Sequence, residues 1–333
     1  MARTNLPNRR FRVLLHGLPY FCRMLPEILQ DDNWDIQFHP TDNVASLFKL
    51  IAELKRTDLL FNWGARISMG KVLRGAKALQ TKRIILFWCG SDTLAAQKEF
   101  NRDQLDPWVA RQIHWAGAPW LAEEIQALGI SCEYVPITWA KAVRDPAPLP
   151  KQFSVLTYLP KPQLGRLYGL DRMLRVAWEL PHIPFTLVGL LSGRVSGAPP
   201  NLRILPRDPD MDRHFRDATV YWRPVSHDGL SFMALEALSY GRHVLWSYPF
   251  PYCITTRNVD EDIAEIQRLH ALHQSGSLSM NQAGRELIFQ SFTPERVKGR
   301  FLDKWKSIIA PATTAFPPQD AWNELETISG TAR

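Results

Sequence analysis

The residues best suited to chemistry lie in one stretch, from Pro224 to Trp246. A short apolar run, residues 218–222, precedes it and predicts a buried strand. Asp228 lies in the loop that follows, and Glu236 lies within an apolar segment that has no helix-breaking residue. A carboxylate is rarely buried without a partner, and a pair of sugar hydroxyls would be one such partner.

The same loop is suited to binding phosphate. Ser231 is a predicted N-cap of the next helix, and Gly241 lies where a C-cap glycine is expected. The backbone N–H groups of a helix start, here around Leu230 and Ser231, are unpaired and lie at the positive end of the helix dipole. Gly229 has no side chain, so a ligand can approach the backbone there. The stretch therefore predicts a strand, a phosphate-binding loop, a helix and a second strand.

This stretch resembles the signature of retaining GT-B glycosyltransferases of the family-4 type, in which seven residues separate two glutamates. Asp228 stands at the first glutamate and Glu236 at the second, and the family spacing is kept throughout. His243 replaces the usual proline near the end of the pattern. The resemblance covers roughly residues 11–308. It implies a glycosyltransferase that uses a nucleotide-sugar donor and a glycan or lipid-linked acceptor.

The resemblance also implies roles for single residues. Glu236 would bind the ribose hydroxyls of the nucleotide. Asp228 would face the donor sugar and the diphosphate, together with the backbone at Gly229, Leu230 and Ser231. Catalysis in this family is thought to proceed on one face of the sugar, where the leaving phosphate helps to deprotonate the acceptor. The reaction then requires no dedicated nucleophile.

The basic residues that would bind the diphosphate are harder to identify in this sequence than the carboxylates. The family uses an arginine and a lysine at the start of the second domain, but Tyr168 occupies the lysine position. The nearest cations, Lys161 and Arg166, are therefore the candidates. Gly17 is a further candidate for ligand binding, because it follows the predicted strand at 11–15, where an α/β domain places its first ligand loop.

At the end of the fourth strand, the family has a histidine and an aspartate on the sugar side of the site. The aspartate is retained as Asp92, which joins Asp228 and Glu236 as a candidate catalytic residue. Cys89 replaces the histidine. Either the reaction does not need that histidine, or another group such as His16 or His114 serves instead.

Strands alternate with helices along most of the chain, which predicts an α/β fold with doubly wound parallel sheets. The resemblance specifies two Rossmann-like domains, the GT-B architecture, with a cleft between them and closing C-terminal helices. The predicted strands are 11–15, 34–38, 58–62, 83–87, 112–115, 132–135, 153–157, 185–189, 201–205, 218–222 and 243–246.

The prolines at 145–150 predict a stiff linker between the two domains. We expect an N-terminal, acceptor-side domain over 1–145 and a nucleotide-sugar domain over 151–292. We expect a C-terminal helix over 293–310 to pack back toward the first domain. Residues 311–333 are expected to form an irregular tail.

Composition limits the class of protein. The 333 residues are 45% hydrophobic and 22% charged, which is typical of a globular chain. There is no apolar run long enough to span a membrane and no secretory signal. Four scattered cysteines without a Cys-x-x-Cys pair indicate reduced thiols and a cytoplasmic protein.

The net charge of +7 would suit any of three anionic binding partners: nucleic acid, an anionic lipid surface or an anionic substrate. The arginines are spread and no nucleic-acid-binding motif is present, so we expect no nucleic-acid partner. Peripheral contact with an anionic inner membrane surface is the preferred interpretation, and charge for solubility is the alternative.

No metal or other cofactor is expected apart from the donor itself. Asp208 and Asp210 form an Asp-x-Asp in a proline turn, and His270 and His273 lack a third ligand. There is no Gly-x-Gly-x-x-Gly dinucleotide fingerprint. Two alternatives to a transferase remain open: a catalytically inactive GT-B binding protein and a sugar-nucleotide epimerase.

Overall fold

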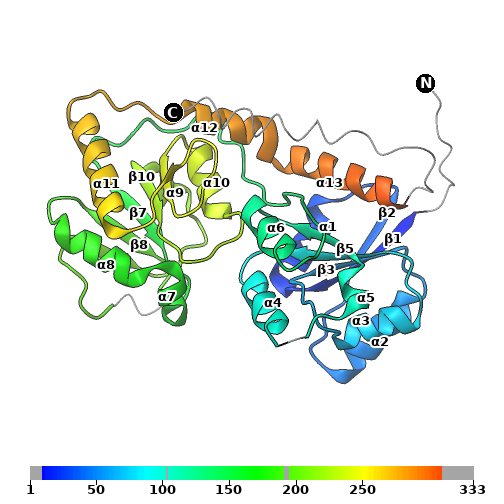
Figure 1. The fold of residues 1–333 in the computed structure, drawn as a ribbon. Helices are drawn as coiled ribbons and strands as arrows, with labels where there is room; N and C mark the ends of the chain where they lie inside the picture. The colour runs from blue at the N-terminus through cyan, green and yellow to red at the C-terminus, as the bar shows by residue number, and fades with distance from the viewer. Residues whose placement is uncertain (1–9, 103, 191–194, 310–333) are drawn as a thin grey trace. The chain divides into compact units, whose positions relative to one another are not determined.

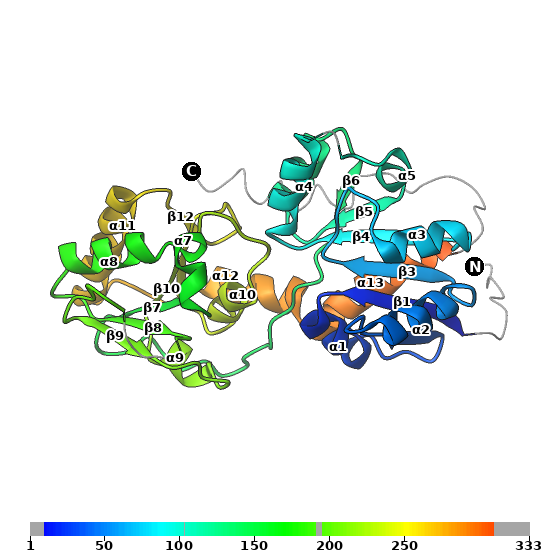
Figure 2. The same ribbon diagram turned by 90° about the horizontal axis from the view of Figure 1, so that it is seen from below.

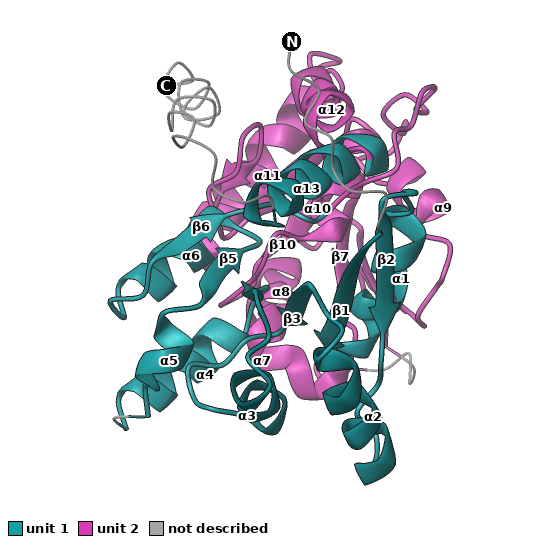
Figure 3. Ribbon diagram, turned by 90° about the vertical axis from the view of Figure 1, so that its right-hand side faces the viewer, with its two compact units in different colours: residues 1–138, 294–314 teal, residues 139–293, 315–333 magenta. Residues whose placement is uncertain are grey.

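The computed structural model describes residues 10–102, 104–190 and 195–309 (Figure 1). The chain divides into two compact units, residues 1–138 with 294–314 and residues 139–293 with 315–333 (Figure 3). Each unit contains one six-stranded parallel sheet flanked by helices. The predicted α/β fold with two parallel sheets is therefore confirmed.

The sheet of unit 1 has the strand order β2-β1-β3-β4-β5-β6. Every residue of β3 and β4 is buried, as expected of apolar strands in a parallel sheet that is covered on both faces. The chain passes from β1 to β2 on one side and returns to β3 on the other, so the topological switch point lies between β1 and β3. The strands are β1 (Phe11–Gly17), β2 (Trp34–Phe38), β3 (Leu59–Trp63), β4 (Ile84–Trp88), β5 (Ile113–Ala116) and β6 (Cys132–Tyr134).

The last helix of the described chain belongs to unit 1 and lies along one face of its sheet (Figure 2). Phe301 and Trp305 of this helix contact the ring of Phe61, at centroid distances of 5.5 and 5.9 Å. The helices of unit 1 are α1 (Pro19–Ile28), α2 (Val44–Leu54), α3 (Lys71–Ala78), α4 (Asp92–Phe100), α5 (Pro107–Ala110), α6 (Pro119–Gln126) and α13 (Pro294–Ile309).

The sheet of unit 2 has the order β12-β11-β10-β7-β8-β9. The chain passes from β7 through β8 to β9 and returns to β10 on the other side of β7, so the switch point lies between β7 and β10. The strands are β7 (Val155–Tyr158), β8 (Phe185–Val188), β9 (Leu202–Leu205), β10 (Val220–Arg223), β11 (His243–Trp246) and β12 (Ile254–Thr255).

The helices of unit 2 are short except for α11. They are a 3-10 turn (Pro162–Leu164), α7 (Gly165–Tyr168), α8 (Leu170–Glu179), α9 (Asp212–Arg216), α10 (Phe232–Ser239), α11 (Val259–Gln274), α12 (Gln282–Leu287) and a π-helical turn (Ile288–Phe292). Helices α8 and α11 lie side by side (Figure 1).

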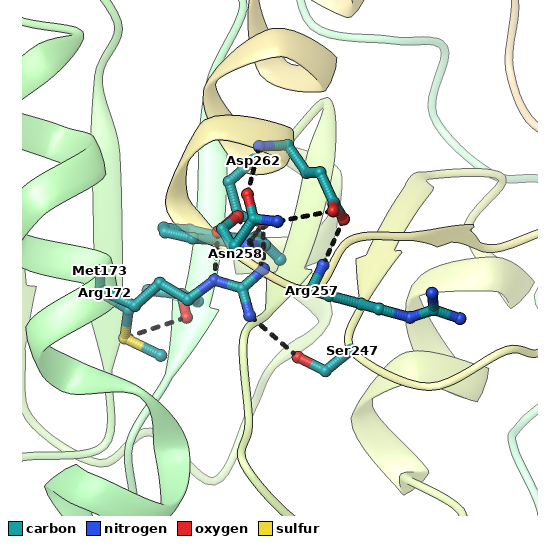
Figure 4. A network of polar contacts seen from close by, with 9 residues as sticks. Arg172, Met173, Ser247, Arg257, Asn258 and Asp262 are labelled. Carbon is teal, nitrogen blue, oxygen red and sulfur yellow. Dashed lines mark hydrogen bonds and ion pairs between the residues drawn. The ribbon is translucent and has the colours of Figure 1, made fainter.

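A buried ion pair joins these two helices (Figure 4). Asp262 of α11 is fully buried and accepts hydrogen bonds from the Nε and Nη2 of Arg172 on α8, the latter at 2.7 Å. It also accepts the indole N–H of Trp222 at 3.0 Å. Arg172 in turn donates to the hydroxyl of Ser247 at 3.3 Å. Burial raises the pKa of Asp262, although its partners favour the carboxylate.

The boundary expected at 145–150 differs from that of the structure, because unit 2 already begins at residue 139. The proline-rich segment is fastened to unit 2 by hydrogen bonds to its carbonyl groups. Arg242, which is fully buried, donates to the carbonyl oxygens of Ala147 at 2.5 Å and Pro148 at 3.1 Å. His273 hydrogen-bonds the carbonyl of Pro150 at 2.8 Å.

Several helices differ from the sequence patterns. Helices α4, α5 and α7 were not predicted from the sequence. The helical pattern of residues 67–79 predicts a helix that starts at Ile67, but α3 begins four residues later, at Lys71. The predicted tail at 311–333 lies outside the described residues. Among the helices that are described, none has the length and apolar character needed to cross a membrane.

Candidate functional site

The switch point of unit 2 brings together two loops that carry most of the predicted site residues. The segment after β7 contains Lys161 and Arg166, and the loop after β10 contains residues 228–231. The two loops touch: the backbone N–H of Ser226 donates to the carbonyl of Leu167 at 2.8 Å. Ligands in open α/β sheets bind at the carboxyl ends of strands, at such a switch point.

Gly169 explains why these loops approach so closely. Its φ is +72°, and a Cβ there would lie 2.0 Å from the carbonyl oxygen of Pro224. Only glycine fits at this position. The preceding residue is Tyr168, at the position where the sequence resemblance leads us to expect a lysine.

Asp228 is held by an ion pair that the sequence analysis missed. Arg223, the last residue of β10, donates from Nε to Oδ2 at 2.5 Å and from Nη2 to Oδ1 at 2.8 Å. The indole of Trp246 donates to Oδ2 at 3.0 Å. The side chains of Arg223 and Asp228 are only 8% and 10% exposed. The Asp228 carboxylate is therefore already bound by side chains of the protein itself, and it does not need a ligand to neutralise its charge.

Arg223 also lies beside Tyr168. Its guanidinium lies 5.1 Å from the centre of the Tyr168 ring, and its Nη1 lies 3.4 Å from the hydroxyl of Tyr221. A cation is thus present beside the lysine position, but it comes from β10. The signal in the sequence was a charged residue directly after the apolar run at 218–222.

The start of α10 has the predicted geometry. The Ser231 hydroxyl accepts a hydrogen bond from the backbone N–H of Ala234 at 3.2 Å, which confirms the N-cap. Gly241 has a φ of +68° after the last turn, as expected of a C-cap glycine. Gly229 and Leu230, which precede the cap, are buried.

Glu236 differs from the other acidic residues of the site. It is half-buried on α10, between the buried residues Leu235 and Ala237. Within the described chain, no hydrogen-bond partner contacts its carboxylate. Burial, followed by the negative charge of Asp212, raises the pKa of Glu236 from 4.5 to about 7. Such a carboxylate is stabilised by any ligand that brings hydroxyl donors to it.

Lys161 and Arg166 are both exposed. In the described part of the chain, neither forms an ion pair with a carboxylate. They are therefore available to an anionic ligand at the switch point.

Two predicted residues, Gly17 and Asp92, belong to unit 1. Asp92 accepts hydrogen bonds from the backbone N–H groups of Cys89 at 3.1 Å, Gly90 at 2.7 Å and Ala65 at 3.2 Å. Burial raises the pKa of Asp92 to about 6, against the lowering effect of these amides. The carboxylate therefore fastens the loops after β3 and β4.

Gly17 ends β1 with a φ of +118°, and a Cβ there would lie 1.7 Å from the carbonyl oxygen of Trp63. Glycine is required for this close approach. His114, one candidate to replace the family histidine, is buried. Its Nδ1 accepts the indole N–H of Trp88 at 3.1 Å, and its Nε2 donates to the carbonyl of Val109 at 3.0 Å. Both ring nitrogens are engaged, so His114 has a structural role.

The described residues contain no group of three or more His, Cys, Asp or Glu side chains that could hold a metal ion.

The chain matches no family model, and no curated protein matches its sequence. Its fold, however, matches solved glycosyltransferases. HepE from Anabaena, in complex with UDP and glucose, has a TM-score of 0.63 at 10% identity, over 90% of this chain and 100% of that one. Sucrose-phosphate synthase from Thermosynechococcus elongatus has a TM-score of 0.62 at 12% identity, over 90% of this chain and 99% of that one.

A third match is the pneumococcal O-GlcNAc transferase GtfA in complex with UDP and GlcNAc. It has a TM-score of 0.55 at 15% identity over 80% of this chain, which spans only 59% of the length of GtfA. The chain likewise spans 61% of the matched chain of the GtfA/B complex and 57% of TarM. The fold of this chain, with its two six-stranded parallel sheets, is therefore that of the GT-B glycosyltransferases.

Proposed function

We propose that this protein is a glycosyltransferase that moves a sugar from a nucleotide-sugar to a hydroxyl of a glycan or lipid-linked acceptor, with retention of configuration. The observation that carries the proposal is Glu236, a half-buried carboxylate without a partner in the described chain, on the helix that starts at the switch point. Neighbours of the same fold include proteins solved with UDP and a sugar.

In this proposal, different residues of unit 2 bind different parts of the donor. The ribose hydroxyls donate to Glu236, and the diphosphate lies near Lys161, Arg166 and the backbone of the β10–α10 loop. Asp228 holds that loop in shape through its ion pair with Arg223. We propose that the side-chain cations and backbone amides suffice for the diphosphate, without a metal ion.

Nucleotide binding is the first test, with the wild-type protein and a panel of UDP, GDP, ADP and their common sugar conjugates. One nucleotide should raise the unfolding temperature, since a ligand at one hundred times its dissociation constant adds about 2.7 kcal/mol of apparent stability. Glu236→Ala should weaken that nucleotide about tenfold to a hundredfold, because hydrogen bonds to charged groups contribute about 1.5–3 kcal/mol.

The matched control is Glu286→Ala, which removes an exposed glutamate from α12 of the same unit and should leave affinity unchanged. If the wild type binds no nucleotide, the transferase proposal fails and a non-catalytic binding protein takes its place. If Glu236→Ala binds as well as the wild type, the assigned role of Glu236 is wrong. The anomeric configuration of the product, measured by NMR, tests retention.

We also propose that unit 1 contacts an anionic membrane surface through the outer face of α2 and α3. Val44 and Phe48 of α2 are 69% and 67% exposed, which is unusual for large apolar side chains. Helices α2 and α3 and the two residues after α2 also carry exposed cations that no carboxylate pairs in the described chain: Lys49, Lys55, Arg56, Lys71 and Arg74. Residues 64–83 include six Lys or Arg and no acidic residue.

A cavity of about 340 Å³ at the end of α2 is lined by the unpaired cations Lys55 and Arg56, together with Arg12, Thr57, and the ion pair of Lys82 with Asp58. The protein should sediment with phosphatidylglycerol vesicles and not with phosphatidylcholine vesicles. Phe48→Ser and Lys71→Ala should each weaken the association. Trp178→Ser, which removes a 55%-exposed aromatic from unit 2, is the control. Equal binding to both vesicle types would reject an electrostatic membrane contact.

A further inference from the structure

The crossover from β11 to β12 carries an aromatic side chain that the proposed function has not used. Tyr248 lies two residues beyond β11, at the carboxyl edge of the sheet of unit 2. It is half-buried, so part of the residue is accessible to a ligand. Its ring packs edge-on against that of His227, with centroids 6.4 Å apart, and lies 6.4 Å from the ring of Trp246.

Both neighbours connect Tyr248 to the donor loop, residues 228–231. His227 directly precedes Asp228, and the indole of Trp246 donates to Oδ2 of Asp228 at 3.0 Å. In the proposed function, the backbone of this loop binds the diphosphate. The sugar of a nucleotide-sugar is bonded directly to the diphosphate, so it lies beside the same loop. Tyr248 therefore borders the place that the donor sugar would occupy.

The backbone before Tyr248 is held by two elements of unit 2. The N–H of Ser247 donates to the carbonyl oxygen of Arg223, the last residue of β10, at 3.3 Å. The hydroxyl of Ser247 accepts a hydrogen bond from Nη1 of Arg172 on α8, also at 3.3 Å (Figure 4). Tyr248 therefore follows a residue that is fixed both to the sheet and to a helix.

The backbone after Tyr248 is also restrained. Pro249 has a fixed φ and disfavours the helical conformation for the residue before it. Phe250 is buried, and its ring contacts those of Trp246 at 5.9 Å and Phe292 at 5.7 Å. A side chain on a restrained backbone loses little conformational freedom when a ligand binds, which favours affinity.

A tyrosine ring is suited to packing against a sugar. The C–H groups on one face of a pyranose form an apolar surface that matches an aromatic face, while the hydroxyls around it need polar partners. Axial hydroxyls interrupt that apolar surface. An aromatic partner therefore distinguishes sugars that differ in configuration at a single carbon.

We propose that Tyr248 is a specificity-determining residue whose ring packs against the apolar face of the donor sugar. This rests on the proposed glycosyltransferase function, and all the residues that carry it belong to unit 2. Tyr248 makes and breaks no bond in the reaction. It contributes to the binding of the sugar and not to that of the nucleotide.

The test compares sugar-free and sugar-bearing ligands on the full chain by calorimetry. The ligands are UDP with UDP-glucose and UDP-galactose, GDP with GDP-glucose and GDP-mannose, or ADP with ADP-glucose and ADP-mannose, according to the nucleotide that the wild type binds. Tyr248→Ala should weaken the preferred conjugate about twofold to tenfold, through the loss of an aromatic contact, and leave the nucleotide alone unchanged. The ratio of the affinities for the two epimers should move toward one.

Two further variants separate ring packing from support of the loop. Tyr248→Phe keeps the ring and should bind every ligand as the wild type does. Tyr248→Leu keeps an apolar side chain for folding and should show the same selective loss as Tyr248→Ala. The control, Tyr252→Ala, removes the 42%-exposed tyrosine at the other end of the same crossover and should leave all affinities unchanged.

The failures of the two proposals are distinguishable. A wild type that binds no nucleotide rejects the glycosyltransferase function, and the role of Tyr248 with it. A wild type that binds nucleotide, with Tyr248→Ala and Tyr248→Leu that keep its affinity for the conjugate, rejects only the role of Tyr248. Equal losses of nucleotide and conjugate would also overturn that role, because they would show that Tyr248 only supports the loop. A wild type that binds both epimers equally would overturn its role in specificity.

Discussion

Strands β1 and β3 in unit 1 and strands β7 and β10 in unit 2 flank equivalent topological switch points. At the first, the pair His16 and Asn62 is polar but neutral, with glycines beside it. At the second, the side chains are charged: Arg223 is paired with Asp228, and Lys161 and Arg166 are free of carboxylates in the described chain. The same architecture therefore offers one edge suited to hydroxyl groups and one suited to an anion.

The bonding of the acidic residues sharpens this comparison. Asp92 in unit 1, and Asp228 and Asp262 in unit 2, have hydrogen-bond partners within their own unit. Glu236 has none in the described chain. Carboxylates with partners support the fold, and we expect their loss to reduce stability. The carboxylate without one destabilises the folded chain until a ligand binds, and we expect its loss to reduce binding.

The largest effect on stability is expected from Asp228→Ala. It leaves the buried guanidinium of Arg223 without its counter-ion, which typically costs about 3–5 kcal/mol. Urea unfolding measures this, with Asp210→Ala, an exposed aspartate of the same unit, as the control. The double variant Arg223→Met with Asp228→Leu should recover part of the loss. A loss no larger than that of the control would mean that the ion pair does not support the loop.

Asp92→Ala is expected to have the next largest effect, on unit 1. It leaves the backbone N–H groups of Cys89, Gly90 and Ala65 without their acceptor, and an unsatisfied buried group costs about 1–3 kcal/mol. Asp92→Asn keeps one acceptor oxygen and should lose less. If Asp92→Asn and Asp92→Ala unfold at the same urea concentration as the wild type, Asp92 is free for another role.

Glu236→Gln should act in the opposite direction on stability. The pKa of Glu236 in the folded protein is about 7, above the ordinary 4.5. The protonated side chain therefore adds to the free energy of unfolding. This contribution is fully present below about pH 4.5 and is lost as the pH rises through about 7. Glutamine stays neutral, so the variant should be more stable than the wild type at pH 8, by about 1 kcal/mol after allowance for solvent screening.

Urea unfolding of both proteins across pH 5–8 measures this difference. In the wild type, nucleotide affinity should rise over the same pH range, because the ionised carboxylate accepts both ribose hydroxyls. A stability difference that does not change with pH would show that the Glu236 pKa is not raised.

The smallest stability effects are expected from Lys161→Ala and Arg166→Ala. Both side chains are exposed, so the free energy of unfolding should change by less than about 0.5 kcal/mol. Each should weaken nucleotide diphosphate binding about fivefold at low salt, since an exposed ion pair contributes up to about 1 kcal/mol. Lys151→Ala, an exposed lysine before β7, is the control. Equal losses in all three variants would indicate a nonspecific charge effect.

Much of the fold could be predicted from local patterns. Apolar runs such as 59–63 and 84–88 are buried strands, and the N-cap Ser231 and C-cap Gly241 bound α10 as expected. Helix α4 was missed because its start depends on Asp92 binding the amides of two loops, one of which lies 27 residues earlier. The prolines at 145–150 predict a linker, and the sequence gives no sign of the contact that holds this segment to unit 2, because that contact comes from Arg242, nearly one hundred residues later.

The sequence by itself determined most of the strands and helices, where α10 begins and ends, and that a carboxylate lies on this apolar helix. Burial and hydrogen bonding within a few residues suffice for these features. Only the tertiary structure decided which charges are neutralised inside the protein, such as Arg172 by Asp262, 90 residues apart. It also placed Asn62 beside His16, because the order of the strands determines which side chains meet at the edge of a parallel sheet.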